Sequence, residues 1–173
     1  MTEFLPLQQP QIHPDAFIAD TARIHGDVAI GRDASVWFGV SIRAEEAPAA
    51  IGAGSNVQDN VVIHTDEGFP VVIGTNVTIG HAAIVHGAVV EDDALVGMGS
   101  ILLNGAVVER GALVAAGTVV PPGGRVPAGM VAVGSPMRLI REVRESENES
   151  TGRGLRHYQH YARVYKAMAD QEG

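Results

Sequence analysis

The chain has 173 residues, of which 46% are hydrophobic and 18% are charged, and its formal net charge is −8 at pH 7. This length and composition predict a single domain with a sizeable core, and the negative charge argues against a phosphate-binding surface, so we expect no nucleic-acid partner. Because the chain has no cysteine, disulfides and thiolate ligands are excluded, and any metal must be held by imidazole and oxygen ligands.

The N-terminal residues 1–17 contain neither a basic segment nor an apolar core of the kind that targeting peptides have. Elsewhere in the chain no run approaches the roughly 18 apolar residues that a membrane-spanning helix needs. We therefore expect no membrane partner and a cytoplasmic location.

From Ile12 onward, an aliphatic residue returns at a six-residue period that is interrupted only three times. A small or β-branched residue follows most of these positions by four. This period fits neither a helix of 3.6 residues per turn nor the two-residue alternation of a strand. The repeating positions are Ile12, Ile18, Ile24, Ile30, Val36, Ile42, Ile51, Val57, Ile63, Ile73, Ile79, Val85, Val90, Val96, Leu102, Val108, Val114, Val120 and Val126.

A fixed period of this kind is typical of a solenoid, in which three hexapeptides complete one rung of a triangular prism and the aliphatic residue points inward. The pattern resembles the hexapeptide-repeat proteins that form a left-handed parallel β-helix, and the resemblance covers nearly all of residues 12–136. We therefore predict an all-β solenoid with a β-helix domain at residues 1–136.

Two interruptions of the period lengthen the chain between repeats. Ile51 follows Ile42 by nine residues, and Ile73 follows Ile63 by ten, so we expect loops with three and four extra residues. Loops on a rigid scaffold are favoured places for function.

The repeat stops at Pro136, and a charged segment follows it. Further on, apolar residues recur at helical spacing, which predicts an amphipathic helix whose apolar face needs a partner surface. We predict that residues 137–173 form a linker and a C-terminal helix that packs on the prism. The residues at helical spacing are Leu155, Tyr158, Tyr161, Ala162, Tyr165 and Met168.

The period also predicts which residues lie in one column of the prism. Counting three sides per rung stacks Ile42, Ile63 and Val85, so His64 and His86, which each follow a column residue by one, should lie on one face. Their separation should be one strand spacing of about 4.8 Å. That distance suits two imidazoles that bind one metal ion.

His81 follows Ile79 by two residues, and the same counting places it above Asp59 in a different column. A corner separates it from His64 and His86, so we expect it to join them only across a contact between two copies of the chain. Faces that meet head to tail close into a ring, and a triangular prism suits a homotrimer. Three neutral imidazoles and a water molecule form a typical catalytic zinc environment with one open position.

Three motifs, SIRAEE at 41–46, SNVQDNVVIH at 55–64 and GHAAIVHG at 80–87, resemble those of the γ-class carbonic anhydrases. The resemblance implies that His64, His81 and His86 bind zinc, or alternatively Fe²⁺ or Co²⁺, at sites shared between the subunits of a homotrimer. It also implies roles for five further residues. Gln58 would hydrogen-bond the metal-bound hydroxide, Asn56 would orient Gln58, Arg43 and Asp59 would belong to a polar network at the subunit interface, and Glu46 would stand beside the metal as a proton acceptor.

The activity implied by this resemblance is the reversible hydration of CO₂ to bicarbonate by a metal-bound hydroxide at the trimer interface. Glu46, with Asp66 or Glu67, would then carry a proton away. Glu45 stands where members of the family commonly have aspartate, and the second loop is short compared with the acidic insertion of well-studied members, so we expect slow turnover. Family members also place a tyrosine from the C-terminal helix near the metal.

Two other functions stay open at this point. Many hexapeptide-repeat proteins are coenzyme A-dependent acyltransferases that use a histidine as general base, and a metal-bearing trimer could also be a non-catalytic assembly module. None of the glycines opens a helix as a phosphate-binding loop would, so we predict no binding site for an organic cofactor.

Overall fold

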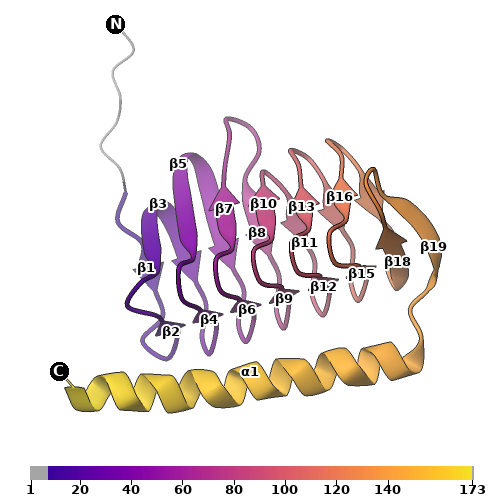
Figure 1. Cartoon of the computed structure of the whole chain (residues 1–173). Coiled ribbons are helices and arrows are strands. Elements are labelled where there is room, and N and C mark those ends of the chain that lie inside the picture. The colour runs from indigo at the N-terminus through magenta and orange to yellow at the C-terminus, as the bar shows by residue number, and fades with distance from the viewer. Residues whose placement is uncertain (1–7, 173) are drawn as a thin grey trace, which may run out of the picture.

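The computed structural model describes residues 8–172 of the chain. The first seven residues of the predicted β-helix domain, and Gly173 of the predicted helical segment, lie outside this range. The described residues form a left-handed parallel β-helix followed by one long helix, which confirms the predicted fold class (Figure 1).

The strands of the prism are short, and most of them contain only the aliphatic repeat residue and the residue before it. Corners between them are tight turns with positive φ angles, which fall mostly on glycine and otherwise on Asp33, Asn60, Asn76, Ala82 and Asp93. In chain order the elements are β1 (Gln11–Ile12), β2 (Phe17–Ile18), β3 (Arg23–Ile30), β4 (Ser35–Val36), β5 (Ser41–Ile51), β6 (Asn56–Val57), β7 (Val62–His64), β8 (Val71–Ile73), β9 (Thr78–Ile79), β10 (Ile84–His86), β11 (Val89–Val90), β12 (Leu95–Val96), β13 (Ile101–Leu102), β14 (Val107–Val108), β15 (Leu113–Val114), β16 (Val119–Val120), β17 (Arg125–Val126), β18 (Met130–Val133), β19 (Arg138–Glu142) and α1 (Glu145–Glu172).

The registers of the parallel pairs agree with the columns that the period predicts. Ile42 pairs with Ile63 and Ile63 with Val85, and all three side chains are 0% exposed. The aliphatic column therefore forms the core of the prism. Burial is incomplete at the N-terminal rung, where Ile12 remains 42% exposed and no described rung covers it from below.

The first interruption of the period is not a loop, as we predicted, but part of the continuous strand β5. This strand pairs with β3, and the register shifts where Gly26 pairs with Ala44 and the next pair is Val28 with Ala49. The extra residues of β5 bulge outward there, and Pro48 stands in the bulge, where no ladder hydrogen bond is required of it. Gly26 permits the close approach, because a Cβ atom at this position would collide with the carbonyl oxygen of Ala44.

The second interruption, residues 65–70, is a turn that rises above the prism between β7 and β8 (Figure 1). An isolated bridge between Asp66 and Phe69 closes it, with a hydrogen bond from the amide of Phe69 to the carbonyl of Asp66 at 2.9 Å. The bulge of β5 supports the turn, because the Thr65 hydroxyl donates to the carbonyl of Ala47 at 2.9 Å.

After the last rung the chain reverses. The segment that the sequence analysis describes as a linker contains β19, which pairs antiparallel with β18 at the end of the prism. Helix α1 then runs back along the prism toward the N-terminal rungs (Figure 1). No helix within residues 8–172 is long and apolar enough to cross a membrane.

An aromatic cluster fastens α1 to the prism. Trp37 is 6% exposed and Ala162 is 5% exposed, and the ring of Trp37 lies 5.2 Å from that of Phe17 and 5.3 Å from that of Tyr158. Edge-to-face contacts of this kind contribute about 0.5–1.5 kcal/mol each beyond the burial of apolar area. Further along the helix, Met168 remains 54% exposed on the protomer.

The N-terminus of α1 is fixed by Glu147. Its carboxylate accepts a hydrogen bond from the backbone N–H of Arg144 at 2.9 Å, and two more from the guanidinium of Arg141 at 2.7 and 2.8 Å. The return bond from the Glu147 amide to the Arg144 carbonyl completes a capping arrangement. The hydrogen bonds from Arg141, and then that from Arg144, lower the pKa of Glu147 to about 2.

This shift predicts how the attachment of α1 responds to acid. Because the folded-state pKa of Glu147 lies below its usual value of 4.5, its contribution is present above about pH 4.5 and is lost as the pH falls toward 2. We expect Glu147→Gln to lower the protection of the amides in the first turn of α1 at pH 7 and to abolish the fall in protection that the wild type shows as the pH drops through this window. Hydrogen–deuterium exchange, corrected for the intrinsic exchange rate at each pH, measures this protection.

The matched control is Glu149→Gln, because the Glu149 carboxylate is 64% exposed and only reaches Arg153 at 3.9 Å. The control should exchange like the wild type. Equal exchange in the two variants would show that Glu147 does not anchor the helix.

Candidate metal centre

His64 and His86 lie side by side on adjacent rungs, as the period predicts. They are register partners of β7 and β10, and their ring centroids are 5.0 Å apart. The closest ring nitrogens, Nδ1 of His64 and Nε2 of His86, are separated by 3.1 Å. Both side chains are about a quarter exposed, at 23% and 30%.

The outer nitrogen of His86 is committed to a hydrogen bond. Its Nδ1 lies 2.7 Å from Oδ1 of Asn104, and the amide nitrogen of Asn104 donates to Oδ2 of Asp66, also at 2.7 Å. Since the amide oxygen of asparagine can only accept, Nδ1 of His86 carries the proton. The inner nitrogen of a neutral His86, Nε2, therefore carries a lone pair, and this lone pair faces Nδ1 of His64.

His64 shows the same arrangement from the other side. Oε2 of Glu45 lies 3.4 Å from its outer nitrogen, Nε2, and offers an acceptor for a proton there when the inner nitrogen, Nδ1, binds a cation. On the protomer alone, Nδ1 of His64 and Nε2 of His86 share a hydrogen bond at 3.1 Å; when both outer nitrogens carry the protons, the two inner lone pairs face the same point. Two nitrogen ligands of a tetrahedral zinc ion would stand about 3.3 Å apart, so this pair fits a metal ion.

The carboxylate of Asp66 lies close to both imidazoles. Oδ1 of Asp66 lies 3.9 Å from Nδ1 of His64 and 3.8 Å from Nε2 of His86, and the ligand atoms of the three residues all fall within 4.8 Å of one another. We call His64, Asp66 and His86 the imidazole–carboxylate group. Its donors are nitrogen and oxygen atoms, which suit zinc or ferrous iron.

His81 occupies a turn at a different corner, between β9 and β10. Its Nδ1 lies 2.9 Å from Oδ2 of Asp59, and its Nε2 lies 3.1 Å from the hydroxyl of Tyr158 on α1. The next residue, Ala82, has φ of 57°, a conformation that costs energy for a residue with a Cβ atom. The turn that presents His81 is therefore strained.

Tyr158 acts as the hydrogen-bond donor in this contact. Burial, and then the negative charge of Asp59, raise the pKa of its hydroxyl, so the phenol remains protonated well above neutral pH. With the proton of the imidazole on Nδ1 facing Asp59, Nε2 of His81 accepts from Tyr158.

Gln58 and Asn56 form a buried chain of hydrogen bonds behind His81. The side-chain amide of Gln58 donates to Oδ1 of Asn56 at 3.0 Å and accepts from the backbone N–H of His81 at 3.1 Å. Asn56 in turn donates to the hydroxyl of Thr78 at 2.9 Å. Asn56 thus fixes the orientation of Gln58, which is 6% exposed.

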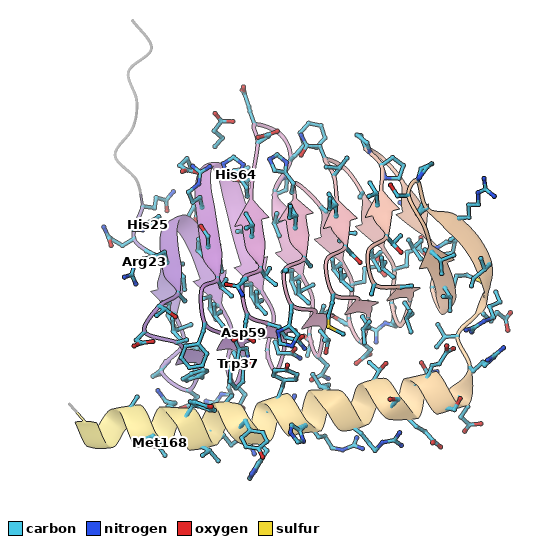
Figure 2. All side chains as sticks on the ribbon, viewed as in Figure 1. Arg23, His25, Trp37, Asp59, His64 and Met168 are labelled. Carbon is cyan, nitrogen blue, oxygen red and sulfur yellow. The ribbon has the colours of Figure 1, made fainter. Side chains whose placement is uncertain are left out.

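The structure therefore divides the predicted site residues between two places on the prism. Arg43, Glu46, His64 and His86 lie at one corner, whereas Asn56, Gln58, Asp59 and His81 lie at another. Figure 2 shows His64 at the edge of the prism away from α1 and Asp59 at the edge that faces α1. Within one protomer, His81 does not join the other two histidines.

At the corner that holds His64 and His86, contacts within the chain fix the acidic residues Glu45 and Glu46. Arg43 bonds Glu45 of its own chain at 2.5 Å, and this pairing holds Glu45 against His64. Glu46 accepts from the backbone N–H of Glu67 at 3.1 Å, so it caps the 65–70 turn.

Asn104 is not among the site residues predicted from the sequence. It lies one rung above His86, two residues after the column residue Leu102, so the period could have placed it near the site. The residue type alone gives no signal, because asparagine is common at the turns of a solenoid.

Comparison with known proteins gives consistent results. Residues 70–104 and 88–122 match the family model described as the hexapeptide repeat of succinyl-transferase. The chain is 46% identical over 162 residues to a carbonic anhydrase of Geobacillus kaustophilus, which covers 94% of this chain and 89% of the relative. It is 38% identical over 164 residues to the mitochondrial gamma carbonic anhydrase 2 of Arabidopsis thaliana, covering 91% of this chain and 59% of that protein.

A solved structure shows the same fold. The crystal structure of a hexapeptide transferase family protein from Anaplasma phagocytophilum matches with a TM-score of 0.87 and 40% identity, covering 90% of this chain and 92% of that one. The names of these relatives thus include both carbonic anhydrases and a transferase family.

The buried chain behind His81 yields a prediction. Asn56→Ala leaves the amide of Gln58 and the hydroxyl of Thr78 without their partner in a site that is 0% exposed at Asn56. We expect a loss of about 1–3 kcal/mol in the free energy of unfolding, measured by denaturant titration. Asn148→Ala, an exposed position on α1, should change it by less than about 0.5 kcal/mol. Equal effects would contradict the structural role of Asn56.

Proposed function

Because this chain belongs to the γ-carbonic anhydrase family of hexapeptide-repeat proteins, we propose that it catalyses the reversible hydration of CO₂ to bicarbonate at a metal site. The ion, zinc or alternatively Fe²⁺ or Co²⁺, is held by His64 and His86 of one protomer and by His81 of a second copy in a homotrimer.

The observation that carries this proposal is the approach of two imidazole nitrogens, Nδ1 of His64 and Nε2 of His86, to 3.1 Å. Each outer nitrogen has an acceptor beside it, Glu45 for His64 and Asn104 for His86. Imidazoles that bind a metal are commonly oriented in this way by an outer acceptor.

A second copy is needed because His81 is held at another corner of its own protomer. Exposed apolar side chains flank both corners. Val62, two residues before His64, is 42% exposed, and Met98, one rung above His81, is 59% exposed. Burying these side chains against each other would bring His81 of one copy toward the imidazoles of the next, and repetition around a threefold axis would close the ring.

When bound, the ion acts as a Lewis acid that makes hydroxide available near neutral pH for attack on CO₂. The residues of the chain orient the groups around it. Asp59 holds the His81 ring through Nδ1, so that Nε2 is the nitrogen available to the ion. Gln58 lies in contact with the backbone of His81, where its amide can bind an oxygen atom of the substrate.

The hydration of CO₂ releases a proton, and carboxylates near the imidazoles can accept it. Asp66 is 40% exposed and lies between the two imidazoles and the solvent. Two further carboxylates belong to the same region: Glu46 lies on the bulge of β5 and Glu67 on the 65–70 turn, and the backbone N–H of Glu67 donates to Glu46. Carboxylates within hydrogen-bond reach of one another or of water can pass the proton outward.

The name of the Anaplasma relative, a hexapeptide transferase family protein, favours transfer chemistry as a second candidate. The form we consider is a coenzyme A-dependent acyl transfer with one histidine as general base. A single base would not require two imidazoles whose nitrogens approach this closely, so we rank this function second. Binding of acetyl-coenzyme A to metal-free protein would reverse the order. A fully metallated protein without hydration activity would instead favour a non-catalytic assembly module.

Subunit mixing tests the shared site. His64→Ala and His81→Ala should each lose CO₂ hydration, measured by stopped flow on protein loaded with zinc or, anaerobically, with ferrous iron. Assemblies formed from equal amounts of the two variants should recover about a quarter of the wild-type rate, because an intact site forms wherever the intact corners of two different variants meet.

Each variant alone provides the baseline for this experiment. Absence of any recovery in the mixture would count against a site shared between copies. A His64→Ala protein that hydrates CO₂ at the wild-type rate would place the activity elsewhere.

A further inference from the structure

We propose that Asp66 is a third metal ligand from the same protomer, so that one chain captures the ion through His64, Asp66 and His86 before a second copy supplies His81. This inference rests on the proposed function, because the same ion is involved, but it assigns a ligand that the three-histidine site does not include.

The distances within the imidazole–carboxylate group support this role. Oδ1 of Asp66 lies 3.8 and 3.9 Å from the inner nitrogens of His86 and His64. Ligands of one tetrahedral ion stand about 3.3 Å apart, so the carboxylate needs to move by only about half an ångström. It also supplies the negative charge that two neutral imidazoles lack.

Asn104 positions two members of this group at once. Its amide nitrogen donates to Oδ2 of Asp66 and its oxygen accepts from Nδ1 of His86, both at 2.7 Å. Oδ1 of Asp66 and Nε2 of His86 therefore face the inner side, toward Nδ1 of His64. One side chain thus orients an oxygen ligand and a nitrogen ligand toward the same point, as outer partners of metal ligands do.

The backbone around Asn104 is shaped to allow this contact. Gly87 has φ of 54°, and a Cβ atom there would collide with Oδ1 of Asn104 and lie 2.7 Å from Cβ of Phe69. Gly87 stands in the five-residue step from Val85 to Val90, where the period is shortened. The shortened corner, the glycine and the 65–70 turn together bring Asn104 and Asp66 up to His86.

The carboxylate then has two successive roles. In the single protomer, Asp66 would give the ion a third ligand, so that a site shared between copies could be loaded before the copies meet. Once His81 of the second copy took the third position, Asp66 would remain beside the site as a proton acceptor.

Zinc affinity, measured by competition with a chromophoric chelator on the intact protein, tests this inference. We expect His81→Ala to bind one zinc ion per chain with reduced affinity, and Asp66→Asn combined with His81→Ala to bind none. Asparagine keeps the shape of aspartate and can still accept from Asn104, so circular dichroism should show a folded protein. The matched control is Glu67→Gln combined with His81→Ala, which removes the same charge from the next residue of the turn and should bind zinc like His81→Ala alone.

A second variant addresses the positioning role of Asn104. Asn104→Leu combined with His81→Ala should weaken zinc binding by about 10–100-fold relative to His81→Ala alone. With Co²⁺ in place of zinc, the visible absorption bands of His81→Ala should disappear when Asp66→Asn is added, because the double variant no longer holds the ion.

The outcomes separate this inference from the proposed function. If the double variant with Asp66→Asn binds zinc as well as His81→Ala does, Asp66 is not a ligand. If His81→Ala binds no zinc while the wild type does, capture by one chain is wrong and the shared three-histidine site stands. If His64→Ala and His86→Ala bind zinc like the wild type, both proposals fail.

Discussion

The parallel pairing of successive rungs is the constraint on which the site depends. Backbone hydrogen bonds hold β7 and β10 in register at a spacing of about 4.8 Å, and buried Ile63 and Val85 prevent either strand from slipping. A slip by one residue would turn the histidines inward and the aliphatic residues outward. The stability of the core and the separation of the two imidazoles are therefore set by the same interaction.

The residues around the imidazoles come from the places where the period is broken. The bulge of β5 supplies Glu45, the 65–70 turn supplies Asp66, and the shortened corner at Gly87 admits Asn104. A regular solenoid presents the same short turn at every corner, so it offers little variety of side-chain positions. Each irregularity adds a polar group at one level of the prism, and the hydrogen bond from Thr65 to Ala47 ties the bulge to the turn.

Periodicity made the fold and the histidine columns predictable from the sequence, because a constant step converts residue number into position. The pairing of His64 with His86 and the separate place of His81 both follow from counting sides. Periodicity says nothing about side-chain contacts between irregular segments. The bond from Asn104 to Asp66, the bulge in place of a loop, and strand β19 therefore became visible only in the structure.

The contact of Tyr158 with His81 depends on how α1 lies against the prism, which no repeat encodes. In the single protomer, the Tyr158 hydroxyl occupies Nε2 of His81, the nitrogen that the proposed shared site needs. A neutral hydrogen bond contributes about 0.5–1.5 kcal/mol, whereas zinc binding in structural sites is worth about 10–16 kcal/mol. The contact with Tyr158 thus holds the His81 ring in place on the protomer and is weak enough to be exchanged for a metal ion at the proposed shared site.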